Sequence, residues 1–194
     1  MFSTKIEHLA DIIVENDNSN STDKEILVYG LTSAIEQGTS ILTTAVLGVL
    51  FGLLLESLIF LVSFSMIRMY AGGYHCKKPT HCYIMSSVIM VAILTILKFT
   101  PIEYITSISI ILLLLSTATI IRYAPVETSN KPLDEKEQKH YRRKTIQNMV
   151  IEYCIILILF IVQQYRWAYV IILGITITAI LVIIQIKIRG ESNG

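Results

Sequence analysis

Two histidine–cysteine pairs stand close together in the segment GGYHCKKPTHCY, residues 72–83. The pairs are His75-Cys76 and His81-Cys82, in a chain otherwise crowded with Ile, Leu and Val. These residue types support two chemistries, because imidazole and thiolate groups bind zinc and also form the nucleophile–base pairs of cysteine enzymes. The spacing of the four side chains bears on which chemistry is available.

A metal site would need all four side chains to point at one ion. Zinc motifs usually separate the two ligands of a pair by two to four residues, so that both face inward. Here the members of each pair are adjacent in the sequence, and adjacent side chains point in divergent directions. We therefore expect no metal and no other cofactor. A metal-binding membrane protein that uses His75, Cys76, His81 and Cys82 is the alternative interpretation.

Covalent catalysis needs only one thiol and one imidazole that the fold brings together. Cys82 is the better candidate nucleophile, because it stands where the polar segment passes into the apolar run CYIMSSVIMVAILTILKF and so begins a helix. The unpaired amides and positive dipole end of a helix start favour a thiolate, the reactive form of cysteine. A thiol at a helix end is nevertheless more often inert than catalytic, so this pattern alone leaves the function open.

The composition indicates that membrane helices carry this segment. Hydrophobic residues make up 53% of the 194 residues and charged residues 16%, whereas charged residues are about 25% of a typical soluble domain. The formal net charge is only +1, and the basic run KHYRRK has no interleaved aromatic pattern, so no nucleic acid partner is expected. The chain has three cysteines, an odd number, and we expect free thiols.

Four apolar segments have about the 20-residue length that crosses a bilayer. The region 26–67 is long enough for two further crossings only if a tight turn, placed near 48–52, joins them. We therefore predict an all-α integral membrane protein with about six transmembrane helices. The four clear segments are residues 83–100, 102–121, 148–165 and 168–187.

The distribution of Lys and Arg predicts the orientation. The loop 122–146 is rich in both, and short loops of this kind stay cytoplasmic. With six crossings, only Lys98 and Arg166 of the sixteen Lys and Arg residues lie near the outer face. The loop 68–82 is then also cytoplasmic, and the candidate thiol site lies at the cytoplasmic edge of the membrane.

The N-terminal residues differ from the rest of the chain. Residues 4–15 place apolar side chains at helical spacing, and a polar linker follows. We predict an amphipathic arm, residues 1–24, that lies on the membrane surface ahead of a polytopic membrane domain, residues 25–194. Packing of this helix on other protein is the alternative.

The run RMYAGGYH, followed after six residues by Cys82, closely resembles the AgrB family, the integral-membrane cysteine peptidases of accessory gene regulator quorum-sensing systems. The stretch RYAPVETSNKPL, residues 122–133, resembles a second part of that family, and length and hydropathy are similar throughout. The resemblance implies an endopeptidase that cleaves the C-terminal tail from an AgrD-like propeptide through an acyl-enzyme thioester and promotes thiolactone or lactone closure. It also implies a multi-pass protein of the bacterial cell membrane, in contact with lipids, that forms a homodimer.

The resemblance assigns Cys82 as the nucleophile and His75 as its base. It gives Arg68 and Gly73 supporting roles, and it matches Cys76 and His81 to no catalytic position. It identifies no third catalytic member. By position, the candidates are Thr32, Ser33 and Glu36, which lie about 9 to 15 Å along the first expected crossing at 1.5 Å per residue.

Other residues carry further expectations. Arg142, Arg143 and Lys144 are candidates for binding the acidic tail of the propeptide, although the positive-inside rule already accounts for their charges. Glu56 and Glu152 fall inside expected spans, where carboxylates are paired or functional. Cys154 is expected to be a small buried residue. Gly48 and Gly52 form a pair of small residues suited to helix packing.

Overall fold

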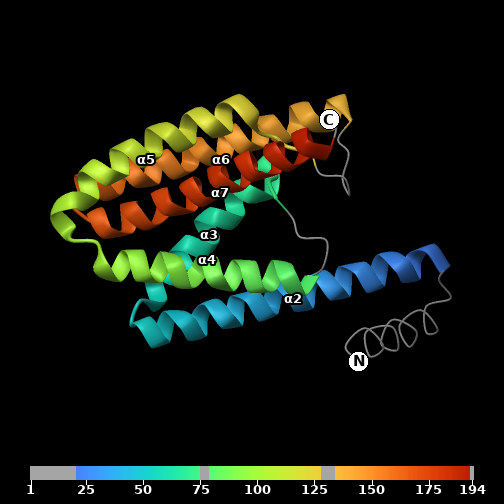
Figure 1. Cartoon of the computed structure of the whole chain (residues 1–194), viewed down its shortest axis with the longest axis horizontal. Helices are drawn as coiled ribbons and strands as arrows, with labels where there is room; N and C mark the ends of the chain where they lie inside the picture. The colour runs from blue at the N-terminus through green and yellow to red at the C-terminus, as the bar shows by residue number, and fades with distance from the viewer. Residues whose placement is uncertain (1–20, 75–78, 128–133, 193–194) are drawn as a thin grey trace. The chain divides into compact units, whose positions relative to one another are not determined.

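A computed structural model describes residues 21–74, 79–127 and 134–192, and within these ranges it is helical with no strand. The predicted amphipathic helix at 4–15 lies outside the described residues. The helices are α2 (Ser21–Phe51), α3 (Leu54–Ala71), α4 (Pro79–Phe99), α5 (Ile102–Tyr123), α6 (Glu135–Ile161) and α7 (Tyr165–Ser192) (Figure 1).

The chain divides into two compact units, residues 1–43 and 44–194, and the division falls within α2. In the first unit, the described side chains of α2 are mostly exposed, and Thr39 Oγ1 donates a hydrogen bond to the Ile35 carbonyl oxygen (2.8 Å). The second unit contains helices α3 to α7 and the candidate thiol.

Five of the described helices, α3 to α7, are long and apolar enough to cross a membrane. The predicted all-α membrane fold is therefore confirmed. The sequence predicted a sixth crossing in the region of α2. The apolar part of α2, Gln37–Phe51, is shorter than the five membrane-length helices.

The predicted turn between the first two helices is confirmed. Gly52 has φ +70°, and the Leu53 N–H donates to the Gly48 carbonyl oxygen at 2.7 Å. A Cβ added at Gly48 would lie 2.3 Å from Ser57 Oγ, so only a residue without a side chain allows this close contact with α3. Gly48 thus serves helix packing within the chain, while Gly52 serves the turn.

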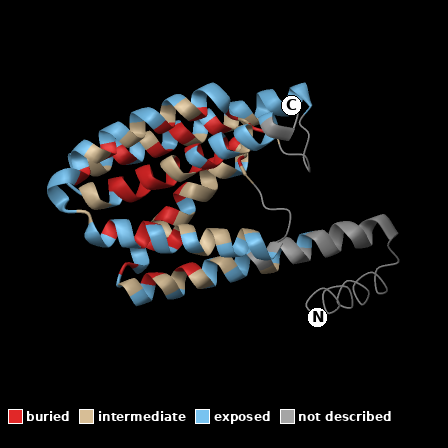
Figure 2. Cartoon of the chain, in the orientation of Figure 1, coloured by how far each residue is buried: buried red, intermediate tan, exposed pale blue. Residues whose placement is uncertain are grey.

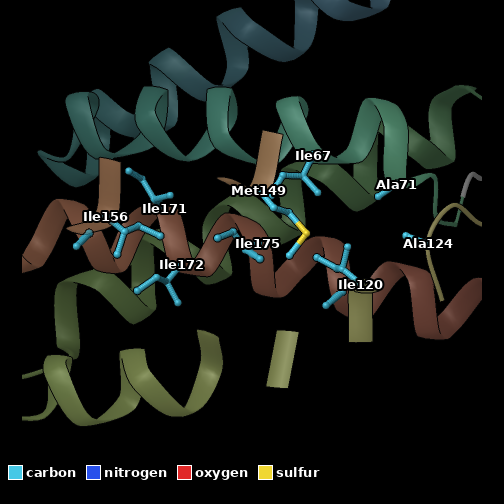
Figure 3. Close-up of a cluster of buried hydrophobic side chains, with 11 residues drawn as sticks. Ile67, Ala71, Ile120, Ala124, Met149, Ile156, Ile171, Ile172 and Ile175 are labelled. Carbon is cyan, nitrogen blue, oxygen red and sulfur yellow. The ribbon is translucent and has the colours of Figure 1, made fainter. Parts of the chain in front are cut away.

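Two clusters of buried apolar side chains hold the second unit together, and α7 contributes to both. The first cluster joins α7 to α3, α5 and α6 (Figure 3). The second joins α7 to α3, α4 and α5. Helix α7 is buried over more of its length than the other membrane-length helices, and buried residues are coloured red in Figure 2. It is the central helix of this unit. The first cluster includes Ile67, Ile120, Met149, Ile172 and Ile175.

Helix α4 packs through its C-terminal half. Met90, Ile93, Leu94 and Leu97 are buried, whereas none of the described residues 80–89 is. The described residues in the half of α4 that carries Cys82 are therefore half-buried or exposed and add none to the buried core.

Helix α6 begins earlier than the apolar pattern predicted. The Asp134 side chain accepts hydrogen bonds from the Glu135 N–H (2.7 Å) and from the backbone N–H of Glu137. The Glu137 side chain accepts one from the Asp134 N–H (3.2 Å), which completes a capping box. One continuous helix then runs through the basic segment into the apolar span. Residues 135–146, expected as part of a loop, are helical because the capping signal starts the helix well before the apolar residues begin.

Polar groups within the apolar helices have distinct environments. Glu56 pairs with Arg166 (3.1 Å), as expected for a carboxylate inside a span. Glu152 is fully buried, and neither carboxylate oxygen has a hydrogen-bond partner in the described part of the chain. The nearby Ser63 hydroxyl donates instead to the Ile171 carbonyl oxygen (3.2 Å).

The expectation that Cys154 is buried is wrong, because its side chain is exposed. The buried face of α6 is formed by Thr145, Met149, Glu152 and Ile156. Two residues beyond Glu152 correspond to a rotation of about 200° around a helix, which places Cys154 on the outer face.

Candidate active site

The two sequence segments that carry the AgrB resemblance meet at one end of the second unit. Gly72, directly after α3, forms an isolated parallel β-bridge with Val126, which follows α5. The Val126 N–H donates to the Ala71 carbonyl oxygen (3.0 Å), and the Tyr74 N–H donates to the Leu181 carbonyl oxygen of α7 (3.1 Å). The backbone leading to the candidate thiol is thus held between the α5–α6 connection and the central helix.

Gly72 is required by this contact. Its φ of +74° and ψ of −151° lie in a region that is essentially restricted to glycine. A Cβ at this position would lie 2.5 Å from the Val126 carbonyl oxygen, which is shorter than any ordinary contact. A glycine pair at 72 and 73 is expected where a side chain would forbid the backbone conformation and where another segment passes close by, and Gly72 meets both conditions.

Gly73, which was expected to support activity, is buried and has φ +126°. A Cβ here would make an ordinary contact with Leu181, at 3.4 Å. The demand for glycine at position 73 therefore comes from the backbone conformation, whereas at Gly72 it comes from both conformation and space.

Arg68, in the last turn of α3, binds the backbone of the glycine segment that follows the helix. Its Nη2 donates to the Tyr74 carbonyl oxygen (2.6 Å), and its guanidinium lies 5.2 Å from the centre of the Phe64 ring. A hydrogen bond from a charged group contributes about 1.5–3 kcal/mol. Arg68 thus helps to position the residue directly before His75.

Cys82 is the fourth residue of α4, and its side chain is half-buried. This confirms the prediction that a helix starts at the candidate nucleophile. Pro79 is the first residue of the helix, a position where its missing N–H leaves no intrahelical bond unmade. The neighbouring His81 is exposed.

Several candidate residues are not brought into this arrangement by the described part of the chain. His75 and Cys76 lie outside the described residues. Thr32, Ser33 and Glu36 lie on α2 in the first unit, and their side chains are also outside the description.

The expected tail-binding residues lie on α6, close to the end of α5. The Arg142 Nη2 donates to the Ile121 carbonyl oxygen (3.2 Å). Arg143 is exposed, and Lys144 is half-buried. Arg142 and Lys139 of α6 share a cleft with Arg122 of α5, which the sequence did not indicate because the connection between the two helices separates Arg122 from the other two residues.

These features define a polytopic α-helical membrane protein with a thiol on the first turn of a span and, earlier in the sequence, a glycine segment clamped by two other parts of the fold. The family model described as "Accessory gene regulator B" matches residues 6–185, and the chain belongs to this family. Family membership places the protein in accessory gene regulation, a quorum-sensing function.

Individual relatives align over most of the chain. An AgrB-like protein of Clostridium perfringens (strain SM101 / Type A) is 30% identical over 91% of this chain and 86% of its own length. Accessory gene regulator protein B of Staphylococcus aureus (strain MRSA252) is 28% identical over 92% of each chain. Protein FsrB of Enterococcus faecalis (strain ATCC 47077 / OG1RF) is 26% identical over 92% of this chain and 72% of its own. No solved structure matches the chain.

Proposed function

We propose that this protein is an integral-membrane cysteine endopeptidase that removes the C-terminal tail of an AgrD-like propeptide and promotes closure of the released core into a ring. The observation that carries the proposal is the placement of Cys82. Its thiol lies in the first turn of α4. Eight residues earlier in the sequence, Arg68 and Leu181 hold the backbone of Tyr74 by hydrogen bonds. Membership of the AgrB family supports the substrate class.

The reaction begins with proton transfer from the Cys82 Sγ–H to His75. The thiolate attacks the carbonyl carbon at the boundary between core and tail, and the tetrahedral intermediate collapses with cleavage of the C–N bond. His75 returns its proton to the leaving amine, which departs with the tail. The product is an acyl-enzyme thioester on Cys82.

Ring closure follows when a thiol or hydroxyl of the propeptide core attacks this thioester and the Cys82 thiolate leaves. Exchange between two thioesters changes the bond energy little, so the enzyme must chiefly exclude water and hold the reacting groups together. A site at the end of membrane-length helices suits the exclusion of water.

The clamped glycine segment positions the base in this mechanism. Consecutive Cα atoms are only about 3.8 Å apart across a trans peptide bond, so the contacts that hold Tyr74 limit where the residue after it can lie. Arg68, Gly72 and Gly73 act through this backbone and are positioning residues. Thr32, Ser33 and Glu36 remain the candidates for a third catalytic member.

Exposed apolar residues in the N-terminal half of α4 offer a surface to a membrane-bound substrate. Ile84 and Val88 are exposed within two turns of Cys82. An amphipathic propeptide can lie along this apolar surface while its scissile bond reaches the thiol. By the positive-inside rule, we place this end of the bundle on the cytoplasmic side, and we propose a homodimer as for the family.

The proposal is tested by intact mass spectrometry of a synthetic AgrD-like propeptide incubated with the protein in liposomes. We expect tail release by the wild type and by the double variant Cys76→Ala/His81→Ala, and none by Cys82→Ala or His75→Ala. Cys154→Ala is the matched control, because it removes an exposed thiol on the outer face of α6.

The contrary result would be loss of activity in the double variant as well, together with inhibition of the wild type by a chelator. That outcome would show that the four residues of the His–Cys pairs bind a metal, and it would replace the thiol mechanism with the metal alternative.

Binding of the acidic propeptide tail by Arg142, Arg143 and Lys144 is a further part of the proposal. Replacing all three with Gln should raise the KM for the propeptide, because the attraction between opposite charges is lost. The rate of Cys82 alkylation should stay unchanged, because the thiol lies on another helix. Unaltered kinetics in a correctly inserted variant would eliminate this role.

A further inference from the structure

A basic cleft of about 360 Å³ opens between the end of α5 and the beginning of α6. It lies next to the connection that pairs with Gly72, since Ala124 and Pro125 in its wall directly precede Val126. The basic cleft is lined chiefly by Arg122, Tyr123, Pro125, Gln138, Lys139 and Arg142.

The three cations of the basic cleft are available to a ligand. Arg122, Lys139 and Arg142 form no ion pair with any carboxylate in the described ranges. Arg142 uses Nη2 for the Ile121 carbonyl oxygen and has further N–H donors. Three uncompensated positive charges around one cavity favour an anionic group.

The carboxylates nearest in sequence do not neutralise this charge. Glu137 is engaged with the backbone in the capping box, and Glu127 pairs with Arg189 (3.2 Å). Glu135 stands one turn before Lys139 and is exposed, with no ion pair in the described part of α6.

An apolar notch adjoins the basic cleft on the same two helices. The two cavities share Ala124 and Arg142 in their walls, and the notch adds Ile121 and Ile146. Ile121 is 50% exposed and Ile146 44% exposed, on helices of membrane length. A cationic cavity beside exposed apolar side chains at the end of two spans matches a phospholipid, which has a phosphate headgroup and acyl chains.

We propose that the basic cleft binds the headgroup of an anionic phospholipid, with an acyl chain along Ile121 and Ile146. Basic pockets between transmembrane helices at a cytoplasmic surface are a recurrent way to hold such headgroups. The proposal does not depend on the peptidase activity. A bound lipid would brace the α5–α6 connection, and through Val126 it would also brace the glycine segment before the candidate active site.

The same cations suit the carboxylates of an acidic peptide. The lipid is the better match, because a peptide carboxylate gives no reason for the exposed isoleucines beside the charged cavity. Competition between the two ligands separates the alternatives.

The test uses the full-length Cys82→Ala variant in neutral detergent, titrated with dioleoylphosphatidylglycerol or dioleoylphosphatidylcholine and followed by native mass spectrometry. We expect tighter binding of phosphatidylglycerol. Removing one charge by Lys139→Gln should weaken that binding about fivefold, and Arg122→Gln/Arg142→Gln about thirtyfold. Lys136→Gln is the matched control, because it removes an exposed charge from the same helix outside the cleft.

The proposal is overturned if the two lipids bind equally, or if Lys136→Gln weakens phosphatidylglycerol binding as much as Lys139→Gln does. It is also overturned if a short Asp- and Glu-rich peptide displaces phosphatidylglycerol at lower concentration than the lipid itself, since the occupant would then be a peptide. Lys139→Gln keeps the test decisive even if the arginine variant misfolds, because the Lys139 side chain is exposed and makes no hydrogen bond among the described residues.

Discussion

Replacing Gly72 by Ala tests whether the contact with Val126 organises the candidate active site. At φ +74° and ψ −151°, a residue with a side chain costs about 1–3 kcal/mol. The new Cβ would also lie 2.5 Å from the Val126 carbonyl oxygen, so the backbone at Val126 must move. Loss of its hydrogen bond to Ala71 adds about 1 kcal/mol. The expected destabilisation is therefore about 2–4 kcal/mol.

Gly52→Ala is the matched control for Gly72→Ala. Gly52 has a similar φ of +70°, but a Cβ there would meet no heavy atom within 4 Å. Its replacement should cost only the backbone strain, about 1–2 kcal/mol. The cost of Gly72→Ala in excess of that of Gly52→Ala then contains the crowding at Val126 and the added strain of the Gly72 ψ of −151°.

Both variants would be compared by thermal melting in detergent and by propeptide cleavage in liposomes. We expect Gly72→Ala to melt at a lower temperature than Gly52→Ala and to cleave at least tenfold more slowly, because only Gly72 lies beside the segment that holds His75. Equal melting and equal cleavage rates would refute the reasoning, since they would show that the contact between Gly72 and Val126 is not needed.

Three further outcomes are expected. Arg68→Gln should lower kcat/KM for the propeptide roughly 10- to 100-fold, because it removes the charged hydrogen bond to Tyr74; an unchanged value would show that this bond does not position the base. Glu152→Leu should raise the melting temperature, because a buried carboxylate without a hydrogen-bond partner in the described residues costs about 1–3 kcal/mol; a lower melting temperature would reveal a role for it. Gly174→Leu should reduce the yield of monodisperse protein in size-exclusion chromatography, because a Cβ there would lie 2.7 Å from the Ser63 hydroxyl of α3. Gly190→Leu should leave the yield unchanged, because a Cβ there meets no heavy atom within 4 Å.

The positions of the membrane helices could be predicted from the sequence because the signals are local. A long apolar run must satisfy its backbone hydrogen bonds internally in lipid, and a helix does so without help from other segments. The same local character allowed the turn at Gly52 and the helix start at Cys82 to be predicted. The beginning of α6 was missed, because the apolar pattern was given more weight than the capping box at Asp134.

The pairing of helices and of single residues required the tertiary structure. Glu56 was expected to have a partner, but Arg166 is far away in the sequence, and only packing of α3 against α7 brings them together. Cys154 was expected to be buried but is exposed. The apolar residues of α6 mark no single face, and the buried face even includes Glu152, so only the packing of the neighbouring helices decides which face is buried.

The amino-acid sequence by itself determined the membrane-spanning class of the protein, its AgrB-like motifs and the location of the candidate nucleophile at a helix start. Each of these depends on residues that are close together along the chain. The tertiary structure decided that Gly72 touches Val126, that Leu181 of α7 holds Tyr74, and that three cations from two helices surround one cleft. These contacts join distant segments, and they exist only because the apolar faces of α3, α5, α6 and α7 pack in one arrangement.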